Sequence, residues 1–285
     1  MILCRFQNKQ DEIHVGAVAD DGVILDLAPA GVVTLHALLE TDNPAAAVRE
    51  LTKQNLPRML RSDIRLLAPV EQHEVWAAGV TYLRSKNARM EESDFSANAY
   101  DRVYEAERPE LFFKSLAHKV VALDEAVGIR RDARWSVPEP ELALVFNSRA
   151  ALVGYAIGND MSSRDIEGEN LLYLPQAKTY SRSCALGPWI RVGVSEDEAR
   201  KWTIRLQIER SGKIVFNGQT SVGQIKRTFN ELREFLFRSQ SFPHGVVLLT
   251  GTGVVPPDQF TLQENDAVSI EISGIGSLRN PVVLV

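Results

Sequence analysis

Three acidic residues of this chain have the types and spacing expected of a site for a divalent cation. Glu139 and Glu141 stand two residues apart, and Asp160 follows the next apolar run. Carboxylates that share one place repel each other unless a positive charge lies between them. An all-oxygen ligand set favours a hard cation, Mg²⁺ with Mn²⁺ or Ca²⁺ as possible substitutes, over zinc or copper. The competing interpretation places both glutamates on the solvated face of a strand and makes Asp160 a helix cap.

Two β-strands must bring these carboxylates together. Residues 139–146 predict the first strand, in which a period of two places both glutamates on one face and the leucines and phenylalanine on the other. Residues 152–157 predict the second strand, which ends at Gly158-Asn159-Asp160 before a Ser-Ser-Arg-Asp-Ile-Glu helix start. If the two strands are neighbours, Asp160 can reach both glutamates.

The stretch around these carboxylates resembles the metal-binding core of the fumarylacetoacetate hydrolase superfamily, where an E-x-E strand and a later Asp at a strand end hold Mg²⁺. The resemblance implies a β-rich α+β fold, a rolled mixed β-sheet with flanking helices and a small N-terminal domain. It also implies a homodimer or higher homo-oligomer. The shared motifs are Pro138-Glu139-Pro140-Glu141, Gly154-Tyr155, Asn159-Asp160, Ser163-Arg164-Asp165, Lys178 and Leu186-Gly187-Pro188.

Three segments carry a narrower resemblance, to the 2-keto-3-deoxy-D-arabinonate dehydratase branch of the family. They are R-P-E-x-F-F-K at 108–114, W-[ST]-x-P-E-P-E-L-A at 135–143 and E-N-x-L-Y-L-P-Q-[AS]-K-x-Y at 169–180. The resemblance covers most of residues 75–285 and is weakest over residues 1–70. It implies a lyase of sugar-acid catabolism, which uses Mg²⁺ to dehydrate a 2-keto-3-deoxy pentonate to a 2,5-dioxopentanoate-type product.

The same resemblance implies roles for five further residues. Lys178 and Glu110 are the candidate proton carriers, and which of them is the acid stays open, as does action through a metal-bound water. Burial near a divalent cation lowers the pKa of a lysine and makes a neutral amine feasible as a base. Thr252, between two glycines, is placed at the floor of the site, and Tyr82 and Arg164 are expected to contact substrate. Without this context, an exposed lysine, a turn glutamate and a loop threonine are the simpler interpretations.

One departure from the family pattern favours dehydration over carbon–carbon bond cleavage. Members that cleave such bonds carry G-x-N-Y-x-x-H, whose His is a general base, whereas this chain has Thr81 and Ser85 at the Asn and His positions. The polar segment 84–99 predicts either a surface helix or a lid that closes over substrate. The alternatives are an acylpyruvate-type hydrolase, a decarboxylase or tautomerase of the same family, and a non-catalytic metabolite-binding protein.

The chain divides into a small α+β unit, residues 1–70, and a catalytic domain, residues 71–285. Residues 2–6, 13–18 and 23–26 predict short strands, and Asp42-Asn43-Pro44 predicts a helix start. The C-terminal half is mostly β. It also predicts a helix that begins at Thr220-Ser221, where Ser221 and Gln224 have capping-box spacing, and continues with an apolar stripe to Leu236.

Composition describes an ordinary globular protein. The 285 residues are 45% hydrophobic and 24% charged, and the net charge is −5. Without a basic cluster, nucleic-acid binding has little support, and no apolar run approaches the roughly 20 residues that span a bilayer. The N-terminus lacks the apolar stretch of a signal peptide, and Cys4 and Cys184 form no disulfide framework. We expect a cytoplasmic protein whose partner is a small 2-keto acid.

Overall fold

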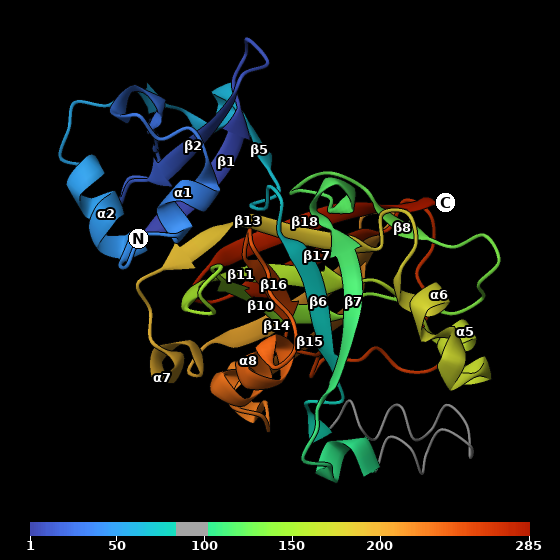
Figure 1. Ribbon diagram of the computed structural model, residues 1–285. Helices are drawn as coiled ribbons and strands as arrows, with labels where there is room; N and C mark the ends of the chain where they lie inside the picture. Colours follow the sequence, from blue (N-terminus) through green and yellow to red (C-terminus); the bar gives the residue numbers. More distant parts are fainter. Residues whose placement is uncertain (84–101) are drawn as a thin grey trace.

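A computed structural model describes residues 1–83 and 102–285 of the chain (Figure 1). In this part of the chain the strands form an 11-stranded mixed sheet, a five-stranded sheet and a two-stranded sheet, with short helices around them. The predicted β-rich α+β class is therefore confirmed. The segment 84–99, including Ser85, lies outside the described residues.

The large sheet has the order β4 (Arg58–Met59), β3 (Ile24–Asp26), β2 (Ile13–Val18), β1 (Ile2–Gln7), β13 (Cys184–Val192), β11 (Leu152–Asp160), β10 (Pro140–Phe146), β16 (Val246–Leu249), β6 (Glu74–Gly79) and β7 (Glu110–Leu116), with β5 (Arg65–Leu67) paired to β1. The five-stranded sheet has the order β15 (Lys213–Ser221), β14 (Thr203–Arg210), β17 (Ala267–Ile272), β18 (Gly276–Leu284) and β8 (Val127–Ile129), and β12 (Ser162–Ser163) pairs with β9 (Ser136–Val137). The α-helices with bounds in the described residues are α1 (Leu35–Leu39), α2 (Pro44–Leu51), α5 (Arg164–Glu169), α6 (Leu174–Lys178), α7 (Glu196–Ala199) and α8 (Phe229–Phe237).

The N-terminal unit and the rest of the chain share the large sheet. The unit, blue in Figure 1, lies at one end of this sheet, where β1 pairs antiparallel with β13 through Ile2↔Arg191 and Leu3↔Ile190. Its predicted strands and the helix that begins at Pro44, capped by Asn43, are confirmed. A domain boundary near residue 70 stays a prediction, and the sheet is continuous across it.

The core occupies both faces of the large sheet, so its central strand β10 is buried on each side. Leu142, Leu144 and Phe146 pack with residues of β14 between the two sheets. Ala143 and Val145 belong to a second cluster, with side chains of α1 and α2. Successive residues of a strand alternate faces, so Glu141 shares the face of Ala143. The solvated-face interpretation of the glutamates is wrong.

The helix predicted from Thr220-Ser221 begins later than expected. Strand β15 continues to Ser221, whose side chain caps a short 3₁₀ turn by accepting from the Gly223 N–H. Helix α8 starts at Phe229 because Thr228 is its N-cap, and Thr228 Oγ1 accepts from the Glu231 N–H at 3.1 Å. The apolar stripe along this helix is buried as predicted, from Phe229 to Leu236.

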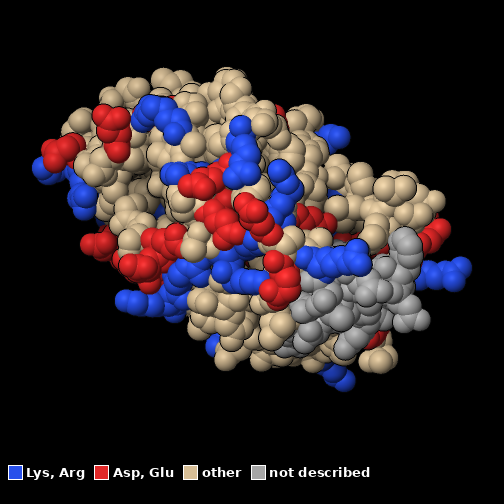
Figure 2. Space-filling model, turned by 60° about the horizontal axis from the view of Figure 1, so that its bottom comes forward, with Lys and Arg blue, Asp and Glu red and all other residues tan. Residues whose placement is uncertain are grey.

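The surface carries both signs of charge in close proximity. Figure 2 shows the molecule from below, with acidic and basic side chains intermingled on this face. None of the helices within residues 1–83 and 102–285 combines the length and apolar character that crossing a bilayer requires.

Candidate metal centre and active site

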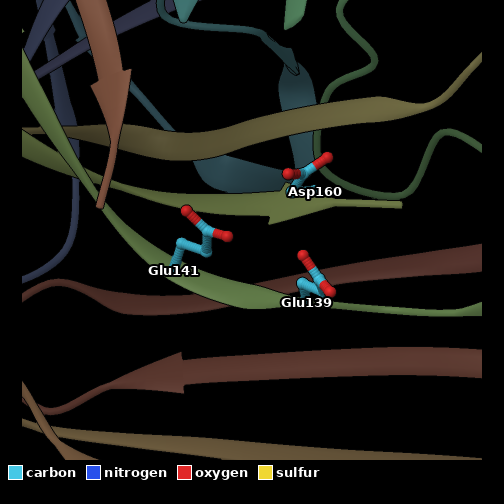
Figure 3. Close-up of side chains that lie close together, drawn as sticks. All are labelled: Glu139, Glu141 and Asp160. Atoms are coloured by element: carbon cyan, nitrogen blue, oxygen red, sulfur yellow. The ribbon is translucent and has the colours of Figure 1, made fainter. Parts of the chain in front are cut away.

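The predicted carboxylate cluster forms where β10 and β11 meet. The antiparallel register pairs Glu141 with Gly158 and Pro140 with Asn159, which brings Asp160 across from the two glutamates. Figure 3 shows the three side chains close together: Glu139 immediately before β10, Glu141 on β10 and Asp160 at the end of β11. One carboxylate oxygen from each lies within 4.8 Å of the others, and the three side chains are buried. Asp160 is the last residue of a strand, so the helix-cap interpretation is wrong.

Three buried cations contact this cluster among the described residues. Lys178 Nζ lies 2.6 Å from Glu139 Oε2 and 3.3 Å from Asp160 Oδ2. Arg164 Nη2 lies 2.9 Å from Glu139 Oε1, and Lys114 Nζ forms an ion pair with Asp160 Oδ1. Buried charges are stable only when they are paired and hydrogen-bonded, and Glu139 and Asp160 both have such partners here.

Glu141 has a perturbed acidity that fits a cation site. Burial raises its pKa well above the usual value, and the charges of Asp160 and Glu139 raise it further. The Gly251 N–H, which donates to Glu141 Oε2 at 2.6 Å, partly opposes this effect. A divalent cation would supply the charge that favours the carboxylate form. Three convergent carboxylates in a buried, oxygen-only donor set suit Mg²⁺.

Lys178 and Glu110 lie on elements that border the cluster. Lys178 is the last residue of α6 and is fully buried, with its ammonium 2.6 Å from Ser162 Oγ and 5.8 Å from the centre of the Phe112 ring. It is therefore not the exposed lysine of the simpler interpretation. Glu110 is the first residue of β7 and pairs with Gly79. Its side chain covers Gly79 so closely that a Cβ there would lie 1.9 Å from Glu110 Oε2.

The three candidate substrate-binding residues are all buried. Tyr82 is 1% exposed, and its hydroxyl has no hydrogen-bond partner in the part of the chain that the structure describes. Burial raises its pKa, and the negative charge of Glu141 adds to the effect. Thr252 Oγ1 accepts from the Val254 N–H at 3.3 Å and therefore also orders its own loop. Arg164 Nη2 donates to Glu139 Oε1 at 2.9 Å, so it orients one carboxylate of the cluster.

Two residues of the site were not predicted. Lys114 is 0% exposed and donates to the carbonyl oxygens of Met161, at 3.0 Å, and of Lys178. Ser162 connects two candidate residues, because its hydroxyl contacts Lys178 Nζ and also donates to the Asp160 carbonyl at 2.9 Å. Lys114 is the last residue of the R-P-E-x-F-F-K run, from which a proton-transfer role was inferred for Glu110 but no role for the lysine.

Comparisons with known proteins identify the family of this chain. The fumarylacetoacetate (FAA) hydrolase C-terminal family matches residues 74–283. A probable 2-keto-3-deoxyxylonate dehydratase of Haloferax volcanii is 44% identical over 223 residues, which are 78% of this chain and 76% of that protein. The 2-dehydro-3-deoxy-D-arabinonate dehydratase of Saccharolobus solfataricus is 36% identical over 276 residues, which are 93% of this chain and 91% of that protein.

A solved structure extends the likeness to the whole chain. It is a 2-keto-3-deoxy-D-arabinonate dehydratase complexed with magnesium and 2,5-dioxopentanoate. It is 32% identical, covers 100% of this chain and 99% of its own, and superposes with a TM-score of 0.81. From the family match, the relatives and the shared architecture, we conclude that the chain belongs to the fumarylacetoacetate hydrolase family.

Proposed function

We propose that this protein is a Mg²⁺-dependent hydro-lyase that dehydrates a 2-keto-3-deoxy sugar acid. The substrate is a pentonate such as 2-keto-3-deoxy-D-arabinonate, and the product is of the 2,5-dioxopentanoate type. The observation that carries the proposal is the buried cluster of Glu139, Glu141 and Asp160 with Lys178 against it. The relatives named as dehydratases of such acids, and the solved dehydratase with magnesium and 2,5-dioxopentanoate, support it.

Glu139, Glu141 and Asp160 would hold the metal ion. Bound Mg²⁺ supplies Lewis-acid stabilisation of the negative charge that develops on a 2-keto acid when the C3 proton leaves, an effect of several kcal/mol. Arg164 and Lys114 contact these ligands from the protein side and fix their carboxylates in place. We expect Mn²⁺ or Ca²⁺ to substitute, because both also prefer oxygen ligands.

Dehydration requires two proton transfers, which we assign to Lys178 and Glu110. One group removes the C3 proton, and the other protonates the C4 hydroxyl, which leaves as water and gives a C3–C4 double bond. Loss of a proton from C5 and return of a proton to C3 move this double bond to C4–C5, and the resulting enol tautomerises to the C5 aldehyde of the product. The buried position of Lys178 beside the carboxylates supports its role, since proton transfer needs a group within hydrogen-bond reach of the reacting atoms. Tyr82, Thr252 and Arg164 are the proposed substrate contacts, and the unpartnered, buried Tyr82 hydroxyl supports the first of these.

A substrate panel tests the proposal. Purified protein is incubated with 2-keto-3-deoxy pentonates and hexonates and with acylpyruvates, each with Mg²⁺ and with EDTA, and products are identified by mass. We expect a product lighter by one water from a 2-keto-3-deoxy acid, only with metal. Cleavage of an acylpyruvate as the faster reaction, or full activity after thorough chelation, would overturn the proposal.

We further propose a homodimer or higher homo-oligomer that resides in the cytoplasm. Family membership supports assembly, and the two free, buried cysteines are compatible with a reducing compartment. Sedimentation at micromolar concentration tests the assembly, and a monomer there would contradict it.

A further inference from the structure

A single peptide unit, between Thr250 and Gly251, connects a metal ligand to a threonine hydroxyl. The N–H of this unit belongs to Gly251 and donates to Glu141 Oε2 at 2.6 Å. Its carbonyl belongs to Thr250 and accepts from Thr81 Oγ1 at 2.5 Å. Thr81, Thr250 and Glu141 are each at most 1% exposed, so water cannot replace these partners. Hydroxyl, peptide and carboxylate therefore form one buried series of hydrogen bonds.

Two further features hold Thr81 next to the Thr250–Gly251 peptide. The Thr81 carbonyl accepts from the Lys226 N–H at 3.0 Å, a second hydrogen bond that holds this residue in place. Gly251 has a φ of +85°, and a Cβ there would lie 2.2 Å from Thr81 Oγ1 and 3.0 Å from the Ala78 carbonyl oxygen. The close approach of the threonine to this peptide therefore depends on the glycine.

We propose that Thr81 is a positioning residue for the metal ligand Glu141, acting through the Thr250–Gly251 peptide. Hydrogen bonds in series polarise one another, so the Thr81 hydroxyl strengthens the donor that Glu141 receives. The groups that orient metal ligands from outside typically change metal affinity by about 10- to 100-fold. Thr81 stands at the Asn position of the carbon–carbon hydrolase pattern, so this chain uses that position to hold its metal site. The inference rests on the proposed metal site.

Metal binding without substrate is the direct test. Isothermal titration with Mg²⁺ is performed on the wild-type protein, on Thr81→Val, which keeps the shape and removes the hydroxyl, and on Thr81→Ser, which restores it. Thr41→Val is the matched control, because Thr41 Oγ1 also donates to a backbone carbonyl, at 2.7 Å, but in the N-terminal unit. Thermal unfolding in EDTA verifies that each variant is folded, and Thr81→Ala replaces the valine variant if that one is not.

The expected result is about a tenfold weaker affinity for Mg²⁺ in Thr81→Val, with Thr81→Ser and Thr41→Val close to wild type. In turnover assays the Mg²⁺ concentration for half activity should rise by the same factor, while kcat at saturating Mg²⁺ changes little. Wild-type affinity in folded Thr81→Val, or a kcat loss that Mg²⁺ does not restore, overturns the inference alone. Failure of the wild-type protein to bind Mg²⁺ overturns the proposed function as well.

Discussion

Replacing Lys114 with methionine should destabilise the metal-free protein far more than the metal-loaded protein. The change keeps the aliphatic stem and removes the ammonium that pairs with Asp160 and donates to the carbonyls of Met161 and Lys178. Removing one partner of a buried ion pair costs about 3–5 kcal/mol. Asp160 retains Lys178 at 3.3 Å, so we expect the lower end, about 3 kcal/mol. For a chain of this size that is a fall in Tm of roughly 6–12 °C.

Magnesium should reverse part of this loss. Lys114, Lys178 and Arg164 place three positive charges against the carboxylates of Glu139 and Asp160, so removal of one ammonium leaves a site that attracts a cation more strongly. Bound Mg²⁺ stabilises a folded state by about 2.7 kcal/mol at 100 times its Kd, and tighter binding by the variant increases this gain. The difference in stability from wild type should therefore shrink when Mg²⁺ replaces EDTA.

Urea unfolding in EDTA and in saturating Mg²⁺ measures both quantities. Lys53→Met is the control, because Lys53 forms an exposed ion pair with Glu50 whose loss should cost below about 1 kcal/mol in either buffer. If Lys114→Met is no more destabilising than Lys53→Met, the buried pair does not contribute as argued. If its cost is equal in the two buffers, the charge-balance reasoning is wrong.

Three further predictions follow from the site and its surroundings. Glu141→Ala should abolish both activity and the Mg²⁺ binding that calorimetry detects, because the variant lacks one proposed metal ligand. Its far-ultraviolet circular dichroism should be unchanged, because the fold is kept. Retained Mg²⁺ binding would remove Glu141 from the proposed ligand set. Lys178→Ala should lower kcat by roughly 100-fold or more, and if Lys178 is the base it should also stop exchange of the C3 hydrogen with solvent deuterium. Ser85→Ala should lower kcat by less than about tenfold. The reverse order of these two effects would contradict the assignment of proton transfer to Lys178. Burial, and then the positive charge of His36, lowers the pKa of His73 from 6.5 to about 4. The unfolded chain therefore binds the extra proton between these pH values, and stability should fall by about 3 kcal/mol from pH 6.5 to pH 4. His73→Leu should remove this component in urea titrations across that range, and an unchanged slope would contradict the assignment.

The carboxylate cluster was predictable because local rules determine it. A period of two places Glu139 and Glu141 on one face whatever surrounds the strand. The short connection between β10 and β11 makes the two strands antiparallel neighbours, and the register then carries Asp160 across from both glutamates. The resemblance to a known family added the metal and the reaction, which spacing alone leaves open.

Lys114 and Thr81 could not be predicted in the same way. A lysine in a strand usually points to solvent, and Lys114 is buried only because Asp160 and the end of α6 meet it there. Thr81 differs from the family pattern at its position, and its contact with Thr250 depends on how β6 and β16 are placed side by side. The start of α8 was predicted too early because Ser221 and Thr228 can both act as helix N-caps. Strand β15 extends to Ser221, so the helix begins after the second of them, Thr228.

The pairing of β1 with β13 has a consequence for synthesis on the ribosome. Ile2 leaves the ribosome long before Arg191, the residue with which it pairs. At about 5–20 residues per second, the interval is roughly 10–40 s. Of the strands that pair with β1 in the described residues, β2 and β5 alone are available during this time. Part of β1 then lacks its hydrogen-bond partners and is open to pairing with other chains. Slower elongation before codon 191 should therefore increase aggregation of the nascent protein.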